Sequence, residues 1–375
     1  MESLIIDKRY GMDISTVCVH GCKKRYDTTG AVAVPIFASA TFAHPGVGQS
    51  TGFDYSRSQN PTCEYLEHSA AALEGGEYAV AFSSGMAAVS ALMEMFSPGD
   101  HIVASDDLYG GTYRLFLNVS QKNGVRFTYI DKSEDIAKSI TPATKAVFIE
   151  TPTNPMMRLT DIGAVAKITK ERGLLLIVDN TFLTPYLQRP LLMGADIVLH
   201  SGTKYLGGHN DTLAGLLVVK DSGINEKLRF IAKTTGACLS PFDAFLIVRG
   251  MKTLAVRVER QQETARLIAR WLEQRAAPVV TKVYYCGMGG MISFSVRDEE
   301  TAKRILESVK VIQYAESLGG VESLITYPTL QTHADMPESE RIARGIDSRL
   351  LRLSVGLEAP DDLTADLAQA FGVSP

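Results

Sequence analysis

Two side chains in the middle of the sequence have types and spacing that could hold one small molecule between them. Asp179 follows the apolar run 174–178, and Lys204 follows a second apolar run at 197–199. The interval leaves room for a strand, a connection and another strand. Because open parallel sheets bind ligands in the crevice outside the carboxyl ends of their strands, we expect this acid and this amine to face one ligand.

Pyridoxal phosphate requires such a pair of side chains. A lysine amine condenses with the aldehyde of this cofactor, and a carboxylate keeps the pyridine nitrogen protonated, so that the ring can accept electrons. An isolated Asp and an isolated Lys would more often be an ion pair and a surface residue. Here Ser201 and Thr203 precede Lys204 with hydroxyls that can donate to phosphate oxygens, and two glycines follow closely. This context favours a cofactor site.

Two segments of the chain resemble the cofactor signature of the Cys/Met-metabolism pyridoxal-phosphate enzymes, namely Asp-Asn-Thr-Phe at 179–182 and His-Ser-Gly-Thr-Lys-Tyr-Leu-Gly-Gly-His at 200–209. This family contains the cystathionine γ-synthases, γ-lyases and β-lyases, methionine γ-lyase and the homoserine-ester sulfhydrylases. Further matches continue along most of the chain. The resemblance implies pyridoxal 5′-phosphate as the cofactor. It also implies an α/β fold of the aspartate aminotransferase-like type (fold type I), with helices flanking a mostly parallel sheet.

The composition argues against several other classes of protein. The chain has 375 residues, of which 45% are hydrophobic and 21% charged, so it can bury a large core. A net charge of −4 at pH 7 gives no general attraction for nucleic acid. No apolar run reaches the length of a membrane span. The N-terminus lacks the basic and apolar regions of a secretory signal.

The five cysteines predict free thiols. Their number is odd and their spacing is wide, which argues against a disulfide framework and for a reducing compartment. We therefore expect a cytoplasmic enzyme. Cys18 and Cys22 could belong to a metal site, but no second ligand cluster accompanies them, so we expect no metal.

We divide the chain into three parts. Residues 1–50 contain short apolar pieces broken by proline and glycine, and they predict an extended N-terminal arm that packs on a partner subunit. Residues 51–240 are expected to form the cofactor-binding domain, because strand and helix patterns alternate there as in a parallel sheet. Residues 241–375 predict a smaller C-terminal α/β domain. The resemblance implies the same arm across a dimer, and a homotetramer built as a dimer of dimers.

The resemblance assigns the cofactor phosphate to two segments. Residues 52–62 are similar to the family's Tyr-Ser-Arg-x-x-Asn-Pro-Thr element, which implies that Tyr55 and Arg57 enter the neighbouring subunit's site. A guanidinium fork suits a phosphate, although an arginine beside a turn is more often a surface residue. Small residues at a predicted helix start would let backbone N–H groups approach an anion. The resemblance gives this role to Gly85 and Met86.

The resemblance also assigns residues to the ring and the substrate. Tyr109 lies where the family has a tyrosine that stacks on the pyridine ring and can act as an acid or base; a tyrosine packed on a loop is the alternative. Asn154 would lie near the cofactor O3′ and the substrate carboxylate. Arg352 would bind that carboxylate with help from Ser317, whereas the alternative places Arg352 on the solvated face of a strand.

Glu316 bears on the position of bond cleavage. Family members that act at the γ-carbon commonly have Glu before this serine, and a carboxylate could pair with the distal amino group of cystathionine. We therefore expect cystathionine γ-synthase or γ-lyase chemistry, with a β-lyase or another C–S lyase, such as methionine γ-lyase or a sulfhydrylase, as the runner-up. An aminotransferase and a non-catalytic binding protein are the alternatives from other classes.

The chain departs from the family pattern in two places. Cys63 stands where the family often has Arg, and we expect this change to affect packing rather than chemistry. The region 283–290 lacks a longer insertion that contains His and Pro in other members. This shortening removes none of the matched site residues.

Overall fold

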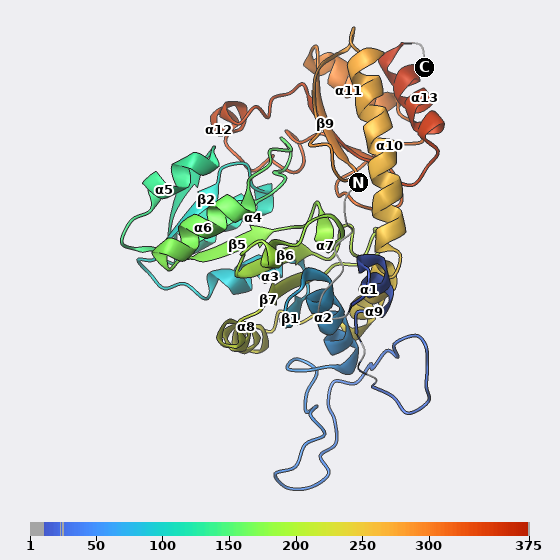
Figure 1. Cartoon of the computed structure of the whole chain (residues 1–375). Helices are drawn as coiled ribbons and strands as arrows, with labels where there is room; N and C mark the ends of the chain where they lie inside the picture. The colour runs from blue at the N-terminus through green and yellow to red at the C-terminus, as the bar shows by residue number, and fades with distance from the viewer. Residues whose placement is uncertain (1–10, 23, 25, 374–375) are drawn as a thin grey trace.

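The computed structural model describes residues 11–22, 24 and 26–373, which form two β-sheets, each with its own helices (Figure 1). The order of strands in the larger sheet is β1 (Tyr78–Phe82), β7 (Gly215–Val219), β6 (Ile197–Ser201), β5 (Leu175–Asp179), β4 (Thr144–Glu150), β2 (His101–Ser105) and β3 (Arg126–Ile130). β7 runs antiparallel to both of its neighbours, β1 and β6, whereas the other described pairs of this sheet are parallel. The predicted mostly parallel α/β sheet is therefore confirmed.

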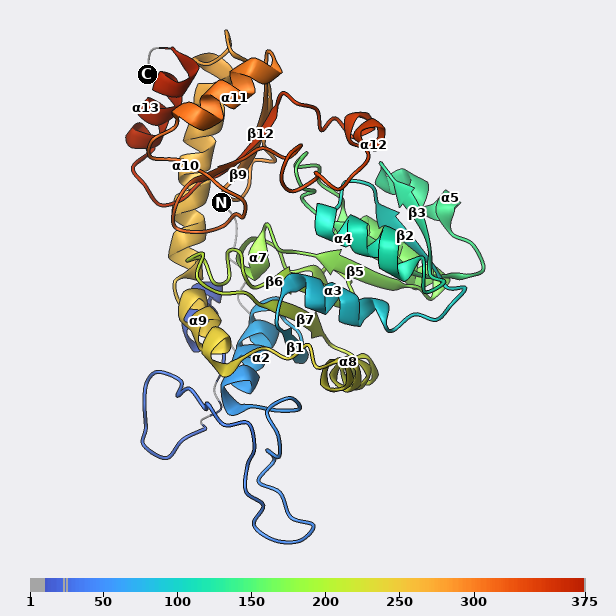
Figure 2. The ribbon, with the colours of Figure 1, turned by 180° about the vertical axis from the view of Figure 1, so that it is seen from behind.

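Helices cover both faces of the larger sheet. One face carries α3 (Gly85–Met93), α4 (Gly110–Leu115) and α8 (Ser222–Thr235), and the other carries α2 (Pro61–Glu74) and α6 (Ile162–Arg172) (Figures 1 and 2). On β5, Leu176 and Val178 pack on the α2 face, whereas Ile177 packs on the α3 face. Burial on both faces explains why the strands read as continuous apolar runs.

The helix α2 begins and ends at residues that the sequence suits to those positions. The side chain of Asn60 accepts from the backbone N–H of Thr62, and Pro61 occupies the first turn. Gly75, with φ of 75°, adopts the left-handed conformation that ends the helix. The last helical residue, Glu74, is consequently fixed beneath the larger sheet and is fully buried.

The smaller sheet has the strand order β10 (Gln313–Tyr314), β11 (Leu324–Thr326), β12 (Leu350–Ser354), β9 (Met291–Val296) and β8 (Val280–Tyr284). Its apolar residues pack against α10 (Leu254–Gln274), α11 (Glu299–Ser308) and α13 (Pro360–Phe371). Side chains alternate between the faces of a strand, so Arg352 points away from these helices while Leu351 and Leu353 pack on them. The opposite face meets the larger sheet, where Ser293 donates to the carbonyl of Pro155 at 2.7 Å.

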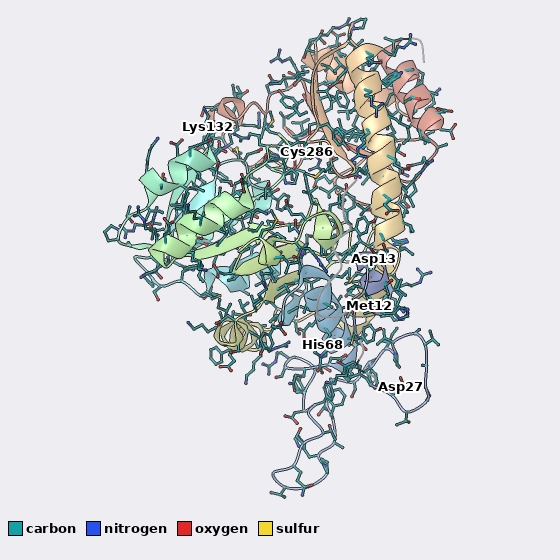
Figure 3. The ribbon with its side chains drawn as sticks, viewed as in Figure 1. Met12, Asp13, Asp27, His68, Lys132 and Cys286 are labelled. Carbon is teal, nitrogen blue, oxygen red and sulfur yellow. The ribbon has the colours of Figure 1, made fainter. Side chains whose placement is uncertain are left out.

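The N-terminal part leaves the body of the molecule. After α1 (Ile14–His20), residues 26–60 contain no helix and project as long loops (Figures 1 and 2). Asp27 lies on one of these loops, whereas Cys286 lies near the smaller sheet in the shortened region (Figure 3). The side chains of Val32 and Val47 are fully open to solvent in the single chain. The first ten residues of the predicted arm lie outside the described residues.

Further helices of the described chain are α5 (Ile136–Ser139), α7 (Thr184–Leu187), α9 (Pro241–Met251) and α12 (Glu338–Ala343). None of the helices within the described ranges is long and apolar enough to cross a membrane. The predicted domain boundary near residue 240 falls at the start of α9, which packs on α2 and the core of the larger sheet before α10 reaches the smaller one. That boundary stays a prediction.

Candidate active site

A cavity of about 190 Å³ lies between the carboxyl ends of β4, β5 and β6 and the smaller sheet. Asp179 and Lys204 both line it, as the strand-end argument predicts. The structure also brings the following predicted site residues to this cavity: Gly85, Met86, Tyr109, Asn154, Ser201, Thr203, Glu316, Ser317 and Arg352. Eleven of the thirteen predicted site residues therefore share one crevice.

The side chain of Lys204 is partly buried and makes one hydrogen bond within the described residues. Its Nζ donates to the Oγ of Ser317 at 3.0 Å. Burial, followed by the nearby positive charge of Arg352, lowers the pKa of Lys204 to about 8, while Glu316 acts in the opposite direction. More of this amine is consequently neutral near pH 7 than of an ordinary lysine, and the neutral form is the one that attacks a carbonyl carbon.

Asp179 lies at the tip of β5 and accepts two hydrogen bonds from Thr181. The backbone N–H of Thr181 donates to Oδ1 at 3.0 Å, and its hydroxyl donates to the same oxygen at 2.6 Å. Burial raises the pKa of Asp179, while the Thr181 hydrogen bonds and the charge of His200 lower it. A cationic group placed against this carboxylate would offset the burial, because an opposite charge favours the ionised form.

The N-terminus of α3 forms one end of the cavity. The side chain of Ser84 accepts from the N–H of Ala87, which leaves the first-turn N–H groups of Gly85 and Met86 without an intrahelical partner. A Cβ on Gly85 would lie 3.0 Å from the Cβ of Ser201. Glycine thus keeps this end open for an anion, which helix N-termini bind well.

Arg352 forms the opposite end. Its Nη1 donates to Asn154 Oδ1 at 2.9 Å, and its Nη2 donates to the carbonyl of Ser317 at 3.0 Å and to Thr326 Oγ1 at 3.2 Å. The residue is only 1% exposed, so the alternative of a solvated strand face is wrong. Its Nε has no partner in the described part of the chain. Burial lowers the pKa of Arg352 to about 10, and the side chain stays a cation that can receive a carboxylate.

Glu316 is exposed at the rim of the cavity. It also lines a second hollow of about 420 Å³, which lies beside the first and shares Thr203, Leu213 and Ser317 with it. Asp211 contributes another carboxylate to this hollow. The outer hollow is thus acidic and can accept a positively charged group.

Tyr55 and Arg57 do not reach the cavity of their own chain. The Nη1 of Arg57 donates to the carbonyl of Lys233 at 2.5 Å, and the guanidinium lies 5.5 Å from the centre of the Tyr55 ring. Tyr55 is 48% exposed. Both residues are exposed and lie in the projecting loops at 26–60, so the single chain leaves them available to another molecule.

Several residues in or beside the cavity were not assigned a role from the sequence. Thr181 binds Asp179, Glu150 accepts from the backbone N–H of Tyr109 at 2.8 Å, and Thr332 lines the cavity beside the buried His333. Burial raises the pKa of Glu150 well above its usual range, and burial lowers the pKa of His333 to about 4. Thr181 carries a local signal, since an Asp side chain commonly accepts from the backbone N–H two residues further on, in a turn of the Asx type.

These residues fit pyridoxal phosphate. An amine with a lowered pKa, a buried carboxylate, an open helix N-terminus and an incompletely paired guanidinium surround one cavity. No group of acidic, cysteine and histidine side chains in the described ranges could hold a metal ion. The fold and the site thus define a pyridoxal-phosphate-dependent enzyme.

Comparison with known proteins narrows this class. The family model described as "Cys/Met metabolism PLP-dependent enzyme" matches residues 15–372, and the chain belongs to this family. It is an enzyme of transsulfuration that acts on small amino-acid substrates with pyridoxal phosphate.

The most similar relatives carry different names. The chain is 54% identical to a cystathionine gamma-synthase/O-acetylhomoserine (thiol)-lyase of Bacillus subtilis, with 92% of each chain covered. It is 45% identical to a cystathionine beta-lyase of Lactococcus lactis, with 96% of this chain and 98% of the relative covered. The crystal structure of a cystathionine gamma-lyase from Lactobacillus plantarum complexed with L-serine has a TM-score of 0.93 at 42% identity, covering 97% of this chain and all of that one.

Proposed function

We propose that the enzyme catalyses γ-replacement or γ-elimination, forming cystathionine from an O-acyl-homoserine and cysteine or cleaving cystathionine at the γ-carbon. The observation that carries this proposal is the acidic outer hollow beside the cofactor cavity. Glu316 and Asp211 can bind the distal ammonium group of cystathionine there, while Arg352 binds the α-carboxylate inside. The similarity to a relative named for γ-synthase activity supports the same conclusion.

Each site residue then has a role that its position supports. Bound pyridoxal phosphate supplies an electron sink for the carbanion that forms at the substrate Cα. Lys204 would hold the cofactor through Nζ and would move protons at that atom during the reaction. Asp179 keeps the pyridine nitrogen protonated. Tyr109 stacks on the ring and can also act as an acid or base.

The two ends of the cavity orient the reactants. The N–H groups of Gly85 and Met86 and the hydroxyls of Ser201 and Thr203 receive the phosphate. Arg352, Asn154 and Ser317 hold the substrate carboxylate, so that the bond from Cα to hydrogen stands perpendicular to the ring and proton loss is favoured over decarboxylation.

We propose that Tyr55 and Arg57 complete the phosphate site of a neighbouring subunit in a homotetramer. Their distance from their own cavity and the open apolar side chains of the arm support this arrangement. Arg57→Ala and Lys204→Ala can be produced separately and then as mixed oligomers. If the residues act in trans, mixing restores part of the activity, since one site keeps both groups. Verified mixed oligomers without activity would contradict the proposal.

We propose residues 51–240 as the cofactor-binding domain and 241–375 as the C-terminal domain, after an arm at 1–50. The two separate sheets support this division. We further propose a cytoplasmic location, supported by five cysteines that are all free.

Product analysis over a small panel of sulfur amino acids tests the reaction. A γ-enzyme releases 2-oxobutyrate from cystathionine or forms cystathionine from O-acetyl- or O-succinyl-homoserine and cysteine. Pyruvate from cystathionine would instead establish β-lyase activity. Conversion of the amino acid to its 2-oxo acid with the pyridoxamine form of the cofactor would establish an aminotransferase.

A further inference from the structure

A buried acid lies behind the two strand tips that carry the cofactor residues. Glu74 is the last residue of α2, and its side chain is inaccessible to solvent. Its Oε1 lies 2.6 Å from His200 Nε2 and 2.8 Å from Asn180 Nδ2. A carboxylate in these contacts accepts, so both nitrogens donate to it.

The two donors come from the ends of β5 and β6. Asn180 directly follows Asp179, and His200 directly precedes Ser201. The paired register of the two strands ends where Asp179 lies opposite Leu199. Because successive side chains of a strand point to opposite faces, Asp179 faces the cavity while Asn180 and His200 face α2. Glu74 thus connects the two strand ends from the side opposite the cofactor.

Further hydrogen bonds between Asn180 and Gln188 lie next to the Glu74 carboxylate. Asn180 Nδ2 also donates to the carbonyl of Gln188 at 2.8 Å, and Gln188 Nε2 donates back to Asn180 Oδ1 at 3.0 Å. We call Glu74, Asn180, Gln188 and His200 the Glu74 cluster. None of the four lines the cavity. A buried acid is unfavourable unless its polar atoms are hydrogen-bonded, and here Glu74 Oε2 and His200 Nδ1 are buried with no partner in the described part of the chain. Stability alone therefore does not explain this cluster.

We propose that Glu74 is a positioning residue, which holds the ends of β5 and β6 at the separation that lets Asp179 and Lys204 contact one cofactor ring. The inference depends on the proposed assignment of these two residues to pyridoxal phosphate. Glu74 acts through Asn180 and His200 and does not touch the cofactor. A second link on the cavity side supports the same geometry, since Thr181 Oγ1 binds both Asp179 Oδ1 and the N–H of Ser201, at 2.6 and 2.9 Å.

The matched control lies on the same helix. Glu67 is another buried acid of α2, which binds Arg229 Nη2 at 2.8 Å and accepts from the N–H of Ala81 at 2.9 Å. Those contacts are made at β1, away from the cavity. Glu67→Gln therefore removes a buried charged contact of α2 without affecting the ends of β5 and β6.

The experiment compares full-length variants by titrating cofactor-free protein with pyridoxal phosphate, with the visible absorbance maximum and the melting temperature as further readouts. Glu74→Gln and His200→Leu should each weaken cofactor binding about tenfold, as for the loss of one hydrogen bond to a charged group, and should move the absorbance maximum. His200→Gln keeps a donor near the position of Nε2 and should restore both properties. Glu67→Gln should lower the melting temperature but should leave both the cofactor affinity and the absorbance maximum unchanged.

Unchanged affinity and absorbance in Glu74→Gln and His200→Leu would overturn the positioning role, and so would equal weakening in Glu67→Gln. If Glu74→Gln does not fold, the contrast between His200→Leu and His200→Gln decides the question. A wild-type chain that binds no pyridoxal phosphate would instead overturn the cofactor assignment itself.

Discussion

The amine of Lys204 donates to the hydroxyl of Ser317 at 3.0 Å, and Ser317 adopts a backbone φ of 102°. Lys204 lies in the loop after β6 of the larger sheet and Ser317 in the loop between β10 and β11 of the smaller sheet, so this contact closes the cavity between the two sheets. A non-glycine residue at such a φ is strained and persists only where the surroundings fix it. Here the carbonyl of Ser317 is held by Arg352 and its Oγ receives Lys204, so both ends of the residue are engaged.

Removal of this hydroxyl should slow the reaction without removing the cofactor. Ser317→Ala deletes the partner of the Lys204 amine, so we expect kcat to fall about fivefold, the net value of one hydrogen bond. Ser317→Gly deletes the same hydroxyl but relieves the strained φ, so it should match the kcat of Ser317→Ala with a higher melting temperature. Steady-state kinetics and thermal denaturation check both statements. A normal kcat in either variant would exclude a role for the hydroxyl.

The charge state of Lys204 should control how fast the enzyme takes up its cofactor. A pKa near 8 means that the amine is protonated and inert below this pH and reactive above it, so the capture rate should rise with a midpoint near pH 8. Arg352→Gln removes a positive charge and should raise the midpoint, whereas Glu316→Gln removes a negative charge and should lower it. Stopped-flow absorbance over a pH series measures the midpoint. A midpoint near 10.5 in the wild type would contradict the burial of the amine.

Arg352→Lys should impair substrate binding more than cofactor binding. Lysine keeps the positive charge but loses the planar fork that binds a carboxylate through two parallel hydrogen bonds. We expect KM to rise by about tenfold or more, since hydrogen bonds to charged groups are worth about 1.5–3 kcal/mol. Arg229→Lys is a control at a partly buried ion pair outside the cavity. Equal KM values in wild type and Arg352→Lys would place the carboxylate elsewhere.

The strand-end residues were predictable from sequence because the fold class decides where they meet. Asp179 and Lys204 follow apolar runs, and a parallel sheet brings the ends of neighbouring strands to one edge. Arg352 was harder to place. Side chains alternate between the two faces of β12, so Arg352 lies on the face opposite Leu351 and Leu353, but this alternation does not say which face is exposed to solvent. The packing of the smaller sheet against the larger one decides which face is buried. That packing depends on contacts such as the hydrogen bond from Ser293 to the carbonyl of Pro155.

Two contacts between residues far apart in sequence were not predicted. Glu150 lies at the end of β4 in a recognisable motif, but its hydrogen bond to the N–H of Tyr109 depends on how two loops pack. Glu74 is an ordinary acid before two glycines in the sequence. Its burial against His200 follows only from the packing of α2 under the sheet. No local pattern predicts either of these hydrogen bonds.

Glu316 should matter for substrates that carry a distal ammonium group. Glu316→Gln keeps the size of the side chain and removes its charge, so KM for cystathionine should rise up to about fivefold, the range of an exposed ion pair. KM for O-acetyl-homoserine should stay the same, because that substrate has no distal charge. Asp335→Asn is a control for an exposed acid outside the cavity. A rise for both substrates would mean that Glu316 acts on the common part of the substrate.

Gly111→Ala should displace Tyr109. A Cβ at Gly111 would lie 2.5 Å from the Cε1 atom of the Tyr109 ring and 3.1 Å from the Sδ of Met86, so the ring must move. Because an aromatic face fixes the plane of the cofactor, we expect weaker pyridoxal phosphate binding and a lower kcat. Gly163→Ala is the matched control, since that glycine lies in α6 with only Asp161 Oδ1 nearby at 3.4 Å, and alanine favours the helix by about 1 kcal/mol. Cofactor titration should separate the two variants, and full affinity in Gly111→Ala would show that the Tyr109 ring is not fixed by this contact.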